Sequence, residues 1–456
     1  MLLSQIEKVG QSNRALRERI ASIRNADTLT EMINCGFRLG IVLAATIVEE
    51  ILNERGRAPE EAPLCPICGQ RLRSKGLAPR SMTTFIGAIR WERRVYRCRK
   101  GCRIGVAAPL DWRLGVRPYQ RSCDKLKKTA CMLAVFAPFE LASWFVRELI
   151  NINVSGSSIW NWMQYAGEKA KVRLEKDLIK LKNGSLKKEE IDARTASLPM
   201  AVGADGVNAP FRPNKGTPCG KVAWREVKVG VIARISSRLT GGGKKVSVLV
   251  RRKLEASLGD IDEFKPRMWM AAKKEGAEEA SDVVWMSDGG RGFWRLFNES
   301  FSHLAQGILD FYHAAQNIWK GAWALRGPSE KEAARWFDWI RGLLRQGKAQ
   351  EVLEQIRISR AFMENLSASE KKTVNNLIGY LEDHLDHIDY ARFKRHGWPI
   401  GSGMVESACK WLIQQRFKCV GMSWSVEGFE NLLHLRLAWV NGDFSELFEP
   451  KASPNF

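Results

Sequence analysis

Three widely separated acidic residues have the sequence surroundings of metal ligands. Asp205 and Asp288 each end a short, mainly apolar run and precede a glycine, and Glu406 follows the glycine-rich segment 401–403. An apolar run stopped by an acid and glycines is typical of a buried strand that delivers a carboxylate to the edge of a sheet. Because magnesium takes oxygen ligands, a few carboxylates and a substrate phosphate can hold it. The sequence therefore predicts a magnesium site at these three residues.

Such a site fits the cleavage of phosphodiester bonds. Two Mg²⁺ ions can activate a water or a 3′-hydroxyl and stabilise the leaving oxygen, so no nucleophilic side chain is needed. The chain contains no GxSxG, Walker A or dinucleotide-binding motif. A structural interpretation is also open, because an aspartate before glycines can simply end a turn, and the helix dipole favours an acid in a first turn.

A fourth acid competes for the position of the second metal ligand. Asp310 lies in the apolar run that begins at Ile308, and His313 follows it three residues later. Asp288 and Asp310 both end apolar runs, so either could be the second ligand. His313 could belong to the site, or it could be a core histidine bonded to Asp310 or to the backbone.

The segments that carry these residues alternate between strand and helix patterns. Residues 283–319 have the pattern of strand, helix, strand and helix, and segments 224–236 and 245–250 add a strand-like meander after the strand of Asp205. Residues 327–395 are almost wholly helical in pattern, and 426–441 form a closing helix. The predicted fold class is multidomain α/β, with an all-α insertion in the catalytic core.

Four cysteines have the spacing of a structural zinc site. Cys65 and Cys68 form a CxxC pair, Cys98 and Cys102 form a CxxxC pair, and the alternating sequence between the pairs predicts a β-hairpin. This arrangement resembles a zinc ribbon, in which four thiolates close a tetrahedral site and leave no open position for catalysis. The alternative is four reduced structural cysteines.

The charge of the chain indicates a polyanionic partner. Its 456 residues include 72 Lys and Arg against 50 acids, and Arg71–Lys128 alone holds 17 basic and 3 acidic residues. The chain has no run of about 18 apolar residues and no signal-peptide pattern, so we expect a cytoplasmic, nucleoid-associated protein without membrane contact. Basic residues beside the cysteine knuckles are predicted to contact DNA phosphates: Arg93, Arg94, Arg97, Lys100 and Arg103.

Two further segments are candidates for DNA contact. Two helical patterns joined by a turn at 151–156 resemble a helix-turn-helix, with Ser157 or Ser158 as the N-cap of the second helix. Its predicted groove-facing residues are Ser158, Asn161 and Gln164. After Glu406, four residues on one helix could grip the DNA backbone: Lys410, Gln414, Arg416 and Lys418. Positions 410 and 414 share the face of Glu406, although a Glu406–Lys410 salt bridge would use the same spacing.

The order of the motifs resembles a known family. An Asp, Asp, helical insertion and Glu in this order resemble the DDE transposases, whose core has an RNase H-like fold. The segments SDGGRGFW, ILDFYHA, PIGSGMVESACK and RFKCVGMSWS, with CPICG and CRKGC upstream, resemble bacterial insertion-sequence transposases of the ISKra type over roughly residues 60–445. The segment GADGVNAPF around Asp205 is a looser match.

This resemblance implies roles for the candidate residues. Asp205, Asp288 and Glu406 would hold two Mg²⁺ ions, and Asp310 and His313 would be an accessory pair, so the resemblance favours Asp288 as the second ligand. The chain would cut the ends of an insertion sequence and join the freed 3′-hydroxyl to target DNA. Because two ends must be cut together, a homodimer or a higher oligomer on DNA is expected.

The predicted organisation has seven segments: a helical N-terminal arm at 1–58, a zinc ribbon at 59–115, a helix-turn-helix-like α domain at 116–190, an RNase H-like core at 197–326 and 396–445, an all-α insertion at 327–395, and a tail at 446–456. Two other functions stay open. A zinc-ribbon and helix-turn-helix regulator with an inactive core would need none of the acids, and an RNase H-like nuclease would cut without strand transfer.

Overall fold

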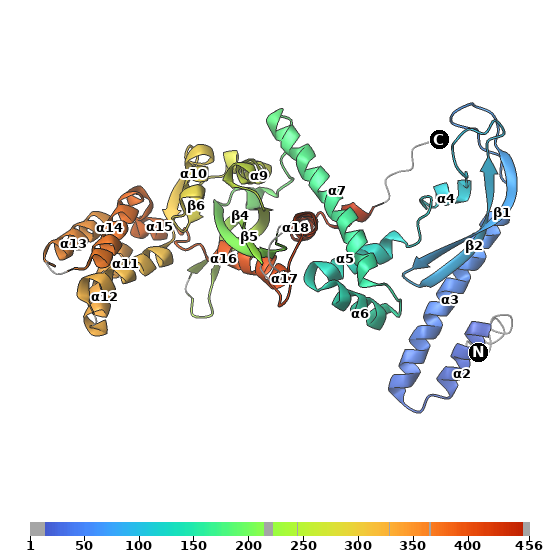
Figure 1. Cartoon of the computed structure of the whole chain (residues 1–456), viewed down its shortest axis with the longest axis horizontal. Helices are drawn as coiled ribbons and strands as arrows, with labels where there is room; N and C mark the ends of the chain where they lie inside the picture. Colours follow the sequence, from blue (N-terminus) through green and yellow to red (C-terminus); the bar gives the residue numbers. More distant parts are fainter. Residues whose placement is uncertain (1–13, 214–221, 244, 328, 364–365, 450–456) are drawn as a thin grey trace. The chain divides into compact units, whose positions relative to one another are not determined.

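A computed structural model describes residues 14–213, 222–243, 245–327, 329–363 and 366–449. The chain divides into two compact units, Met1–Met163 with Ser445–Phe456, and Gln164–Phe444, so the division falls inside helix α7 (Figure 1). Parts of the predicted arm and tail, residues 1–13 and 450–456, lie outside the described residues. Within the described ranges, no helix is long and apolar enough to cross a membrane.

The first unit begins with two helices and a long β-hairpin. Helix α2 (Arg14–Arg24) packs on α3 (Leu29–Arg57), and Thr28 and Glu31 form a capping box that starts α3. Strands β1 (Arg73–Thr84) and β2 (Gly87–Arg97) pair antiparallel, which confirms the predicted hairpin. The predicted alternation from Thr84 to Trp91 contains the turn itself, because the two residues Phe85 and Ile86 connect the strands.

A small helical core follows the hairpin. It is built by α5 (Asp124–Phe136), α6 (Phe139–Ile150) and the start of α7 (Gly156–Lys182), whereas Leu110 of α4 (Pro109–Arg113) packs against the hairpin. The predicted pair of helices with a short turn is present, since α6 ends at Asn151 in the left-handed conformation. The N-cap prediction was wrong by two or three residues, because the Ser155 hydroxyl accepts the bond from the Ser158 N–H (3.2 Å). The short helix η4 (Ser445–Phe448) completes the unit.

The second unit is built on a five-stranded mixed sheet with the strand order β5-β4-β3-β6-β7. Strands β3, β4 and β5 form an antiparallel meander, and β3, β6 and β7 run parallel to one another. The strands are β3 (Met200–Phe211), β4 (Ala223–Leu239), β5 (Lys245–Ser257), β6 (Val283–Ser287) and β7 (Ala305–Leu309). Short helices α8 (Ala193–Ala196) and η1 (Ala277–Glu279) lie in the connections.

Helices cover both faces of this sheet (Figure 1). On one face, α9 (Ile261–Lys274) packs so closely that a Cβ on Gly230 of β4 would lie 2.0 Å from the Met268 sulfur, and α10 (Arg291–Ser300) packs its Phe301 end against Trp285. The other face is covered by α16 (Gly403–Ala408), the π-helical segment η3 (Cys409–Gln414), α17 (Gln415–Phe417) and α18 (Val426–Asn441). The closing helix has the bounds that the sequence predicted.

The segment between β7 and α16 is helical throughout its described residues, as predicted. Its helices are α11 (Phe311–Arg326), α12 (Glu330–Arg345), α13 (Ala349–Ala361), α14 (Ala368–Glu382), η2 (Leu385–His387) and α15 (Tyr390–Arg395). They share one hydrophobic core with the sheet. His384 and His387 pack on the Trp294 ring, with ring centroids 4.6 and 4.4 Å away. His384 is buried in this packing.

Candidate active site and zinc site

Three aspartates lie at the same level on three neighbouring strands. The parallel register pairs Gly203 with Met286 and Met286 with Ile308, and each aspartate, Asp205, Asp288 and Asp310, is two residues further along its own strand direction. Side chains two residues apart project to the same face, and neighbouring strands are about 4.8 Å apart. The chain thus brings three carboxylates to one edge of the parallel part of the sheet.

Asp205 reaches this edge in a way that the sequence pattern did not indicate. It does not end its strand, since β3 continues to Phe211 in antiparallel pairing with β4. What ends near Asp205 is the parallel pairing with β6, which extends only to Gly203 and Met286. Asp205 is therefore paired with β4 on one side, whereas on the side that faces β6 and Asp288 the strand pairing has already ended.

Glu406 is placed over the same edge by close packing of α16 on β3. A Cβ on Gly203 would lie 2.8 Å from Val405 Cγ2 and 2.9 Å from the Met404 methyl carbon. Only a glycine at 203 allows this approach, because a contact below 3.0 Å forces a shift of the helix. Glu406 is the next residue after Val405, in the first turn of α16, so the glycine on the strand sets the position of the acid.

The charges of these side chains interact. Burial raises the pKa of Asp205, and the nearby Asp288 and Glu406 carboxylates raise it further, while His313 acts in the opposite direction. Acids gathered in this way repel one another unless a cation neutralises them. Carboxylate oxygens suit Mg²⁺, but among the described residues the donors of this region that all lie within 4.8 Å of one another are those of Asp310, His313 and Glu406, and neither Asp205 nor Asp288 belongs to that group.

A second, overlapping group includes the histidine. One ligand atom each from Asp310, His313 and Glu406 lies within 4.8 Å of the others. The interaction with Asp310 raises the pKa of His313, and the Asp288 and Glu406 carboxylates also raise it. The group could therefore hold a metal ion through its neutral imidazole, and in its protonated form His313 could instead donate a hydrogen bond to the acids.

Asp310 is engaged by protein groups on both carboxylate oxygens. It is 1% exposed and is the N-cap of α11, where Oδ1 accepts the His313 N–H (2.7 Å) and lies 3.2 Å from His313 Nδ1. Oδ2 accepts the Ser402 hydroxyl (2.7 Å) and the Ser402 N–H. Asp310 thereby ties the end of β7 to the loop that begins α16, which makes it a group that positions Glu406.

The pKa of Asp310 gives a test of this positioning role. Burial alone would raise the pKa, but the hydrogen bonds from His313 and Ser402 lower it to about 2. A carboxyl with a folded-state pKa below its unfolded value of about 3.9 stabilises the fold above that pH, and the contribution is lost as the pH falls from about 4 to about 2.

Asp310→Asn is therefore expected to lower the free energy of unfolding by about 2 kcal/mol at pH 7, and by about half as much near pH 3. Urea titrations followed by tryptophan fluorescence, in EDTA, measure both values. A variant as stable as the wild type at pH 7, or a difference that is the same at both pH values, would contradict the role of the ionised carboxylate.

Asp288 has a more open setting. Its Oδ1 accepts the Gly290 N–H (3.0 Å), and its backbone carbonyl accepts the Tyr380 hydroxyl of the insertion (3.1 Å). Gly289 has a φ of +97°, and a Cβ there would lie 2.5 Å from the Tyr380 ring. Gly289 also lines a groove of about 890 Å³ that runs between α10 and α14. Its polar lining includes Arg291, Arg295, Asn375 and Asn376.

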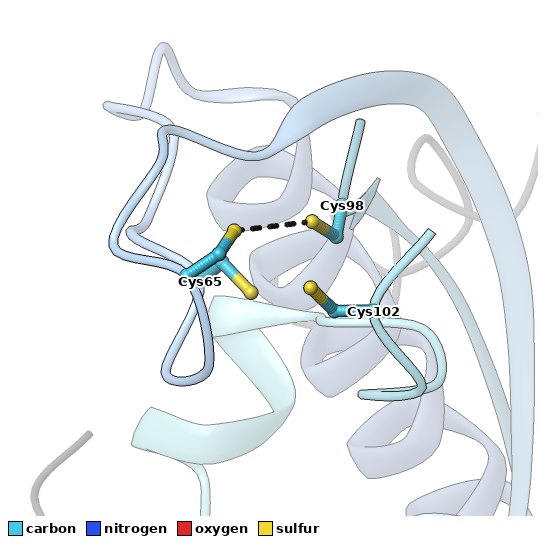
Figure 2. A group of neighbouring side chains, drawn as sticks. Cys65, Cys98 and Cys102 are labelled. Atoms are coloured by element: carbon cyan, nitrogen blue, oxygen red, sulfur yellow. Dashed lines mark hydrogen bonds between the residues drawn. The ribbon is translucent and has the colours of Figure 1, made fainter. Parts of the chain in front are cut away.

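The four predicted zinc ligands are brought together in the first unit. The sulfur atoms of Cys65, Cys68, Cys98 and Cys102 all lie within 4.8 Å of one another, and the Cys68 and Cys98 sulfurs are 3.6 Å apart. Figure 2 shows the labelled thiols of Cys65, Cys98 and Cys102 pointing toward a common centre. Tetrahedral zinc with Zn–S bonds of about 2.3 Å requires sulfurs about 3.8 Å apart, so the four residues fit this ion.

The surroundings of the sulfurs favour metal binding. A hydrogen bond from the backbone of Cys102 lowers the pKa of the Cys98 thiol to about 6. The same hydrogen-bonded pair raises the pKa of the Cys102 thiol to about 12, so without a metal the two neighbouring sulfurs share a proton, which a bound metal would displace. The cluster could hold zinc and would leave no open coordination position.

Comparisons with known proteins add one distant likeness. No protein-family model and no curated protein matches the chain. Among solved structures, the chain is similar to the Drosophila P element transposase strand transfer complex. The TM-score is 0.24 and the identity 9%, over 74% of this chain and 83% of that one. At this score the likeness assigns no residue a role.

The basic residues beside the zinc site divide into two groups. Arg97, Lys100 and Arg103 are exposed and Arg94 is half-buried, so they can reach a ligand. Arg93 is buried: its Nε donates to Asp111 (3.1 Å), and a terminal nitrogen donates to the carbonyls of Ala78 (2.7 Å) and Pro79 (3.0 Å). The prediction of a phosphate contact at Arg93 is wrong, because its donors stabilise the hairpin.

The predicted groove-facing residues of α7 also differ in setting. Asn161 is exposed, and Ser158 is half-buried with its hydroxyl 2.9 Å from that of Ser155. Gln164 accepts a hydrogen bond from the Asn431 side chain of α18. This contact directs Gln164 toward its own unit, so we do not retain it as a DNA contact.

The residues after Glu406 are rearranged by the π-helical segment. Lys410, Gln414 and Lys418 are exposed, but the wider π turn alters the spacing on which a shared face with Glu406 was predicted. Arg416 is 1% exposed and lies over the Trp424 ring (5.3 Å), where burial lowers its pKa to about 10. The predicted DNA contact of Arg416 is therefore wrong. Trp424 is a core residue, and its Nε1 donates to the Phe417 carbonyl (3.1 Å).

Three residues of the site were not predicted. Ser402 binds Asp310, Tyr380 binds the Asp288 backbone, and Cys409 is a buried thiol whose pKa is raised to about 12 by burial and by the Asp205 and Glu406 carboxylates. The serine within Gly-Ser-Gly, just before Glu406, was the one available signal, since a serine there is suited to hydrogen bonding at a helix start.

Proposed function

We propose that this chain is a DDE-type DNA transposase of the insertion-sequence kind. Asp205, Asp288 and Glu406 would hold two Mg²⁺ ions, and the basic first unit would bind the ends of the element. The observation that carries the proposal is the convergence of three strand-borne aspartates and one helix-borne glutamate, from segments up to 201 residues apart, at one edge of the sheet.

The order of the elements supports an RNase H-like core. The first acid is on β3, a meander follows, the second acid ends β6, a helical insertion intervenes, and the third acid opens α16. Each of these features was implied by the motif order of the DDE transposases. The insertion also contributes to the site, because Tyr380 binds the backbone of Asp288.

The two competing aspartates have different proposed roles. Asp288 accepts one side-chain hydrogen bond, from the Gly290 N–H, and is the proposed second metal ligand. Asp310 is engaged by His313 and Ser402 and is the proposed positioning group. This assignment keeps Asp205, Asp288 and Glu406 as the three metal ligands, in the order that the family resemblance implied. His313 would then act as a cation or a proton donor near the scissile phosphate.

The chemistry requires little from the side chains beyond positioning. Bound Mg²⁺ ions would activate the water or 3′-hydroxyl and stabilise the leaving oxygen. The last parallel pair, Gly203 with Met286, places Asp205 and Asp288 two residues further along neighbouring strand directions, and the close packing of Val405 on Gly203 places Glu406 over the same edge. The groove between α10 and α14 offers the DNA strand a polar path away from Asp288.

The basic residues give a matched pair of variants. Arg97→Ala is expected to weaken DNA binding and to reduce the salt dependence of the affinity by about one phosphate contact, with stability changed by less than about 0.5 kcal/mol. Arg93→Ala is expected to destabilise the first unit by about 3 kcal/mol, because Asp111 would remain buried without its partner.

Fluorescence anisotropy on labelled duplex at several salt concentrations measures the first effect, and thermal unfolding measures the second. If Arg93→Ala weakened DNA binding at full stability, Arg93 would have to be a phosphate contact. If Arg97→Ala left both affinity and salt dependence unchanged, the exposed face of β2 would not be part of the DNA-binding surface.

A cleavage assay separates the proposed function from its alternatives. The substrate is a labelled duplex that carries one end of the flanking element, incubated with Mg²⁺ or with EDTA. Metal-dependent cleavage at the element boundary supports the proposal. Cleavage that is never followed by joining would indicate a nuclease, and binding without cleavage would indicate a regulator with an inactive core.

A further inference from the structure

One side of the long helix α3 is an apolar stripe that nothing in the described chain covers. Its five large members are between 43% and 73% exposed. The stripe contains no charged residue, and its members are Leu29, Ile33, Gly36, Phe37, Gly40, Ala44, Ile47 and Ile51. At 100° per residue these positions fall within about one third of the helix circumference. A continuous exposed stripe of this kind marks an interaction surface.

The other sides of α3 are already occupied. Leu39 packs with Leu16 and Ile20 of α2. Toward β2, Asn53 Oδ1 accepts the Glu92 N–H (2.8 Å), and a Cβ on Gly56 would lie 1.9 Å from the Glu92 carbonyl oxygen. These contacts place α2 and β2 on the sides of α3 away from the stripe, so the stripe is the remaining free side of the helix.

The centre of the stripe is shaped for the close approach of another backbone. A Cβ placed on Gly36 or Gly40 would have no atom within 4 Å. With Ala44 these residues form a row of small side chains at i, i+4 and i+8, flanked at both ends by large apolar residues. The distance between the axes of two packed helices depends on the side chains at the contact. The row of small residues therefore allows a second helix to pack closely against α3.

The stripe is also self-complementary. A two-fold axis through Gly40 places Leu29 opposite Ile51, Ile33 opposite Ile47, and Gly36 opposite Ala44, so large residues meet large ones and small meet small. Positions 33, 37, 40, 44, 47 and 51 follow the alternating four- and three-residue spacing of a coiled-coil seam. Antiparallel helices also place opposite ends of their dipoles side by side.

We propose that this stripe pairs antiparallel with the same stripe of a second copy of the chain. The contact is isologous, as in most homodimers, and extends for about 33 Å along each helix. An uncharged apolar surface does not suit DNA phosphates, which separates this face from the basic residues of the same unit. The pairing does not depend on the proposed reaction, and it would exist without DNA.

The first test is the molar mass of the full chain without DNA, measured by light scattering after size exclusion. The wild type is expected to have twice the mass of one chain. The double variant Ile33→Asp with Ile47→Asp is expected to raise the dissociation constant by about a hundredfold or more and to elute as a monomer. Asn34→Asp adds one negative charge to α3 outside the stripe and should stay dimeric.

A monomeric wild type, or a double variant that stays dimeric, would overturn the proposal. Circular dichroism checks that the variants keep their helices. A wild type that becomes dimeric only after removal of residues 2–13 would show that the chain's own N-terminal segment covers the stripe, which also overturns the pairing.

Cross-linking tests the orientation. Ile33→Cys and Ile47→Cys proteins, mixed and oxidised, are expected to form a heterologous disulfide between the two variants. Each variant alone is expected to cross-link poorly, because its cysteines lie on opposite sides of the two-fold axis. Efficient cross-linking of each variant with itself would indicate a parallel pair and would overturn the antiparallel arrangement. None of these results bears on cleavage, so failure here leaves the proposed function to its own test.

Discussion

Replacement of Asp288 by alanine is expected to lower strand cleavage and joining by about a thousandfold or more. A metal ligand supplies several kcal/mol of charge stabilisation in the transition state, and each 1.36 kcal/mol is about a factor of ten in rate. DNA affinity and stability should change little, because the Asp288 side chain makes a single hydrogen bond in its own turn, to the Gly290 N–H. Single-turnover cleavage of a labelled duplex measures the rate.

Two variants serve as controls for this result. Asp288→Asn keeps the hydrogen bond to Gly290 but loses the charge, so it should be nearly as inactive as the alanine variant. Asp310→Asn should lose stability as well as activity, since its carboxylate holds Ser402 and the start of α11. An active Asp288→Ala protein beside a stable, inactive Asp310→Asn protein would move the second ligand to Asp310.

Replacement of Cys65 by serine is expected to remove zinc from the first unit and to unfold the ribbon around the hairpin. Structural zinc contributes an apparent binding free energy of about 10–16 kcal/mol at neutral pH, most of which appears as folding free energy in a small module. Cys65 is the most buried of the four ligands, so a water molecule cannot take the place of the sulfur that the serine variant lacks. The expected readouts are loss of bound zinc by mass spectrometry and rapid proteolysis between residues 59 and 115.

Cys35→Ser is the matched control, because Cys35 lies on α3 and belongs to no cysteine cluster among the described residues. It should keep one zinc per chain and resist the protease. A Cys65→Ser protein with a full complement of zinc and an intact ribbon would contradict the tetrahedral site. Loss of DNA binding together with zinc would connect the ribbon to the recognition of DNA.

The parts of the fold that the sequence predicted are those with strong local patterns. The apolar run that begins at Val283 is a strand, the Val426–Asn441 pattern is a helix with the same bounds, and the cysteine spacing brings four sulfurs together. In each case a single local rule of periodicity or ligand spacing determines the element. Placing such elements in one sheet also predicts that Asp205, Asp288 and Glu406 approach one another, and the Asp288 and Glu406 carboxylates do raise the pKa of Asp205. The run from Ile308 to His313 was predicted as a strand, but the strand ends at Leu309, because Asp310 caps the helix that begins at Phe311.

The parts that the sequence did not predict depend on tertiary contacts. Arg93 and Arg416 have the same side chain as exposed arginines nearby, and only their partners, Asp111 and Trp424, show that they are structural. The capping role of Asp310 required knowing that α11 begins immediately after it. Asp205 lies within a long strand, because the end of pairing with β6, rather than the end of β3 itself, opens the site.

The strand-transfer reaction tests the central claim most directly. A duplex with a pre-cut 3′-hydroxyl end of the flanking element is incubated with circular target DNA, Mg²⁺ and either the wild type or Asp288→Asn. Covalent joining of the 3′ end to the target is expected with the wild type, and no joining is expected with the variant or in EDTA. A wild-type protein that binds the end but never joins it, or a joining activity that survives in Asp288→Asn, would contradict the assignment of this carboxylate site to DNA strand transfer.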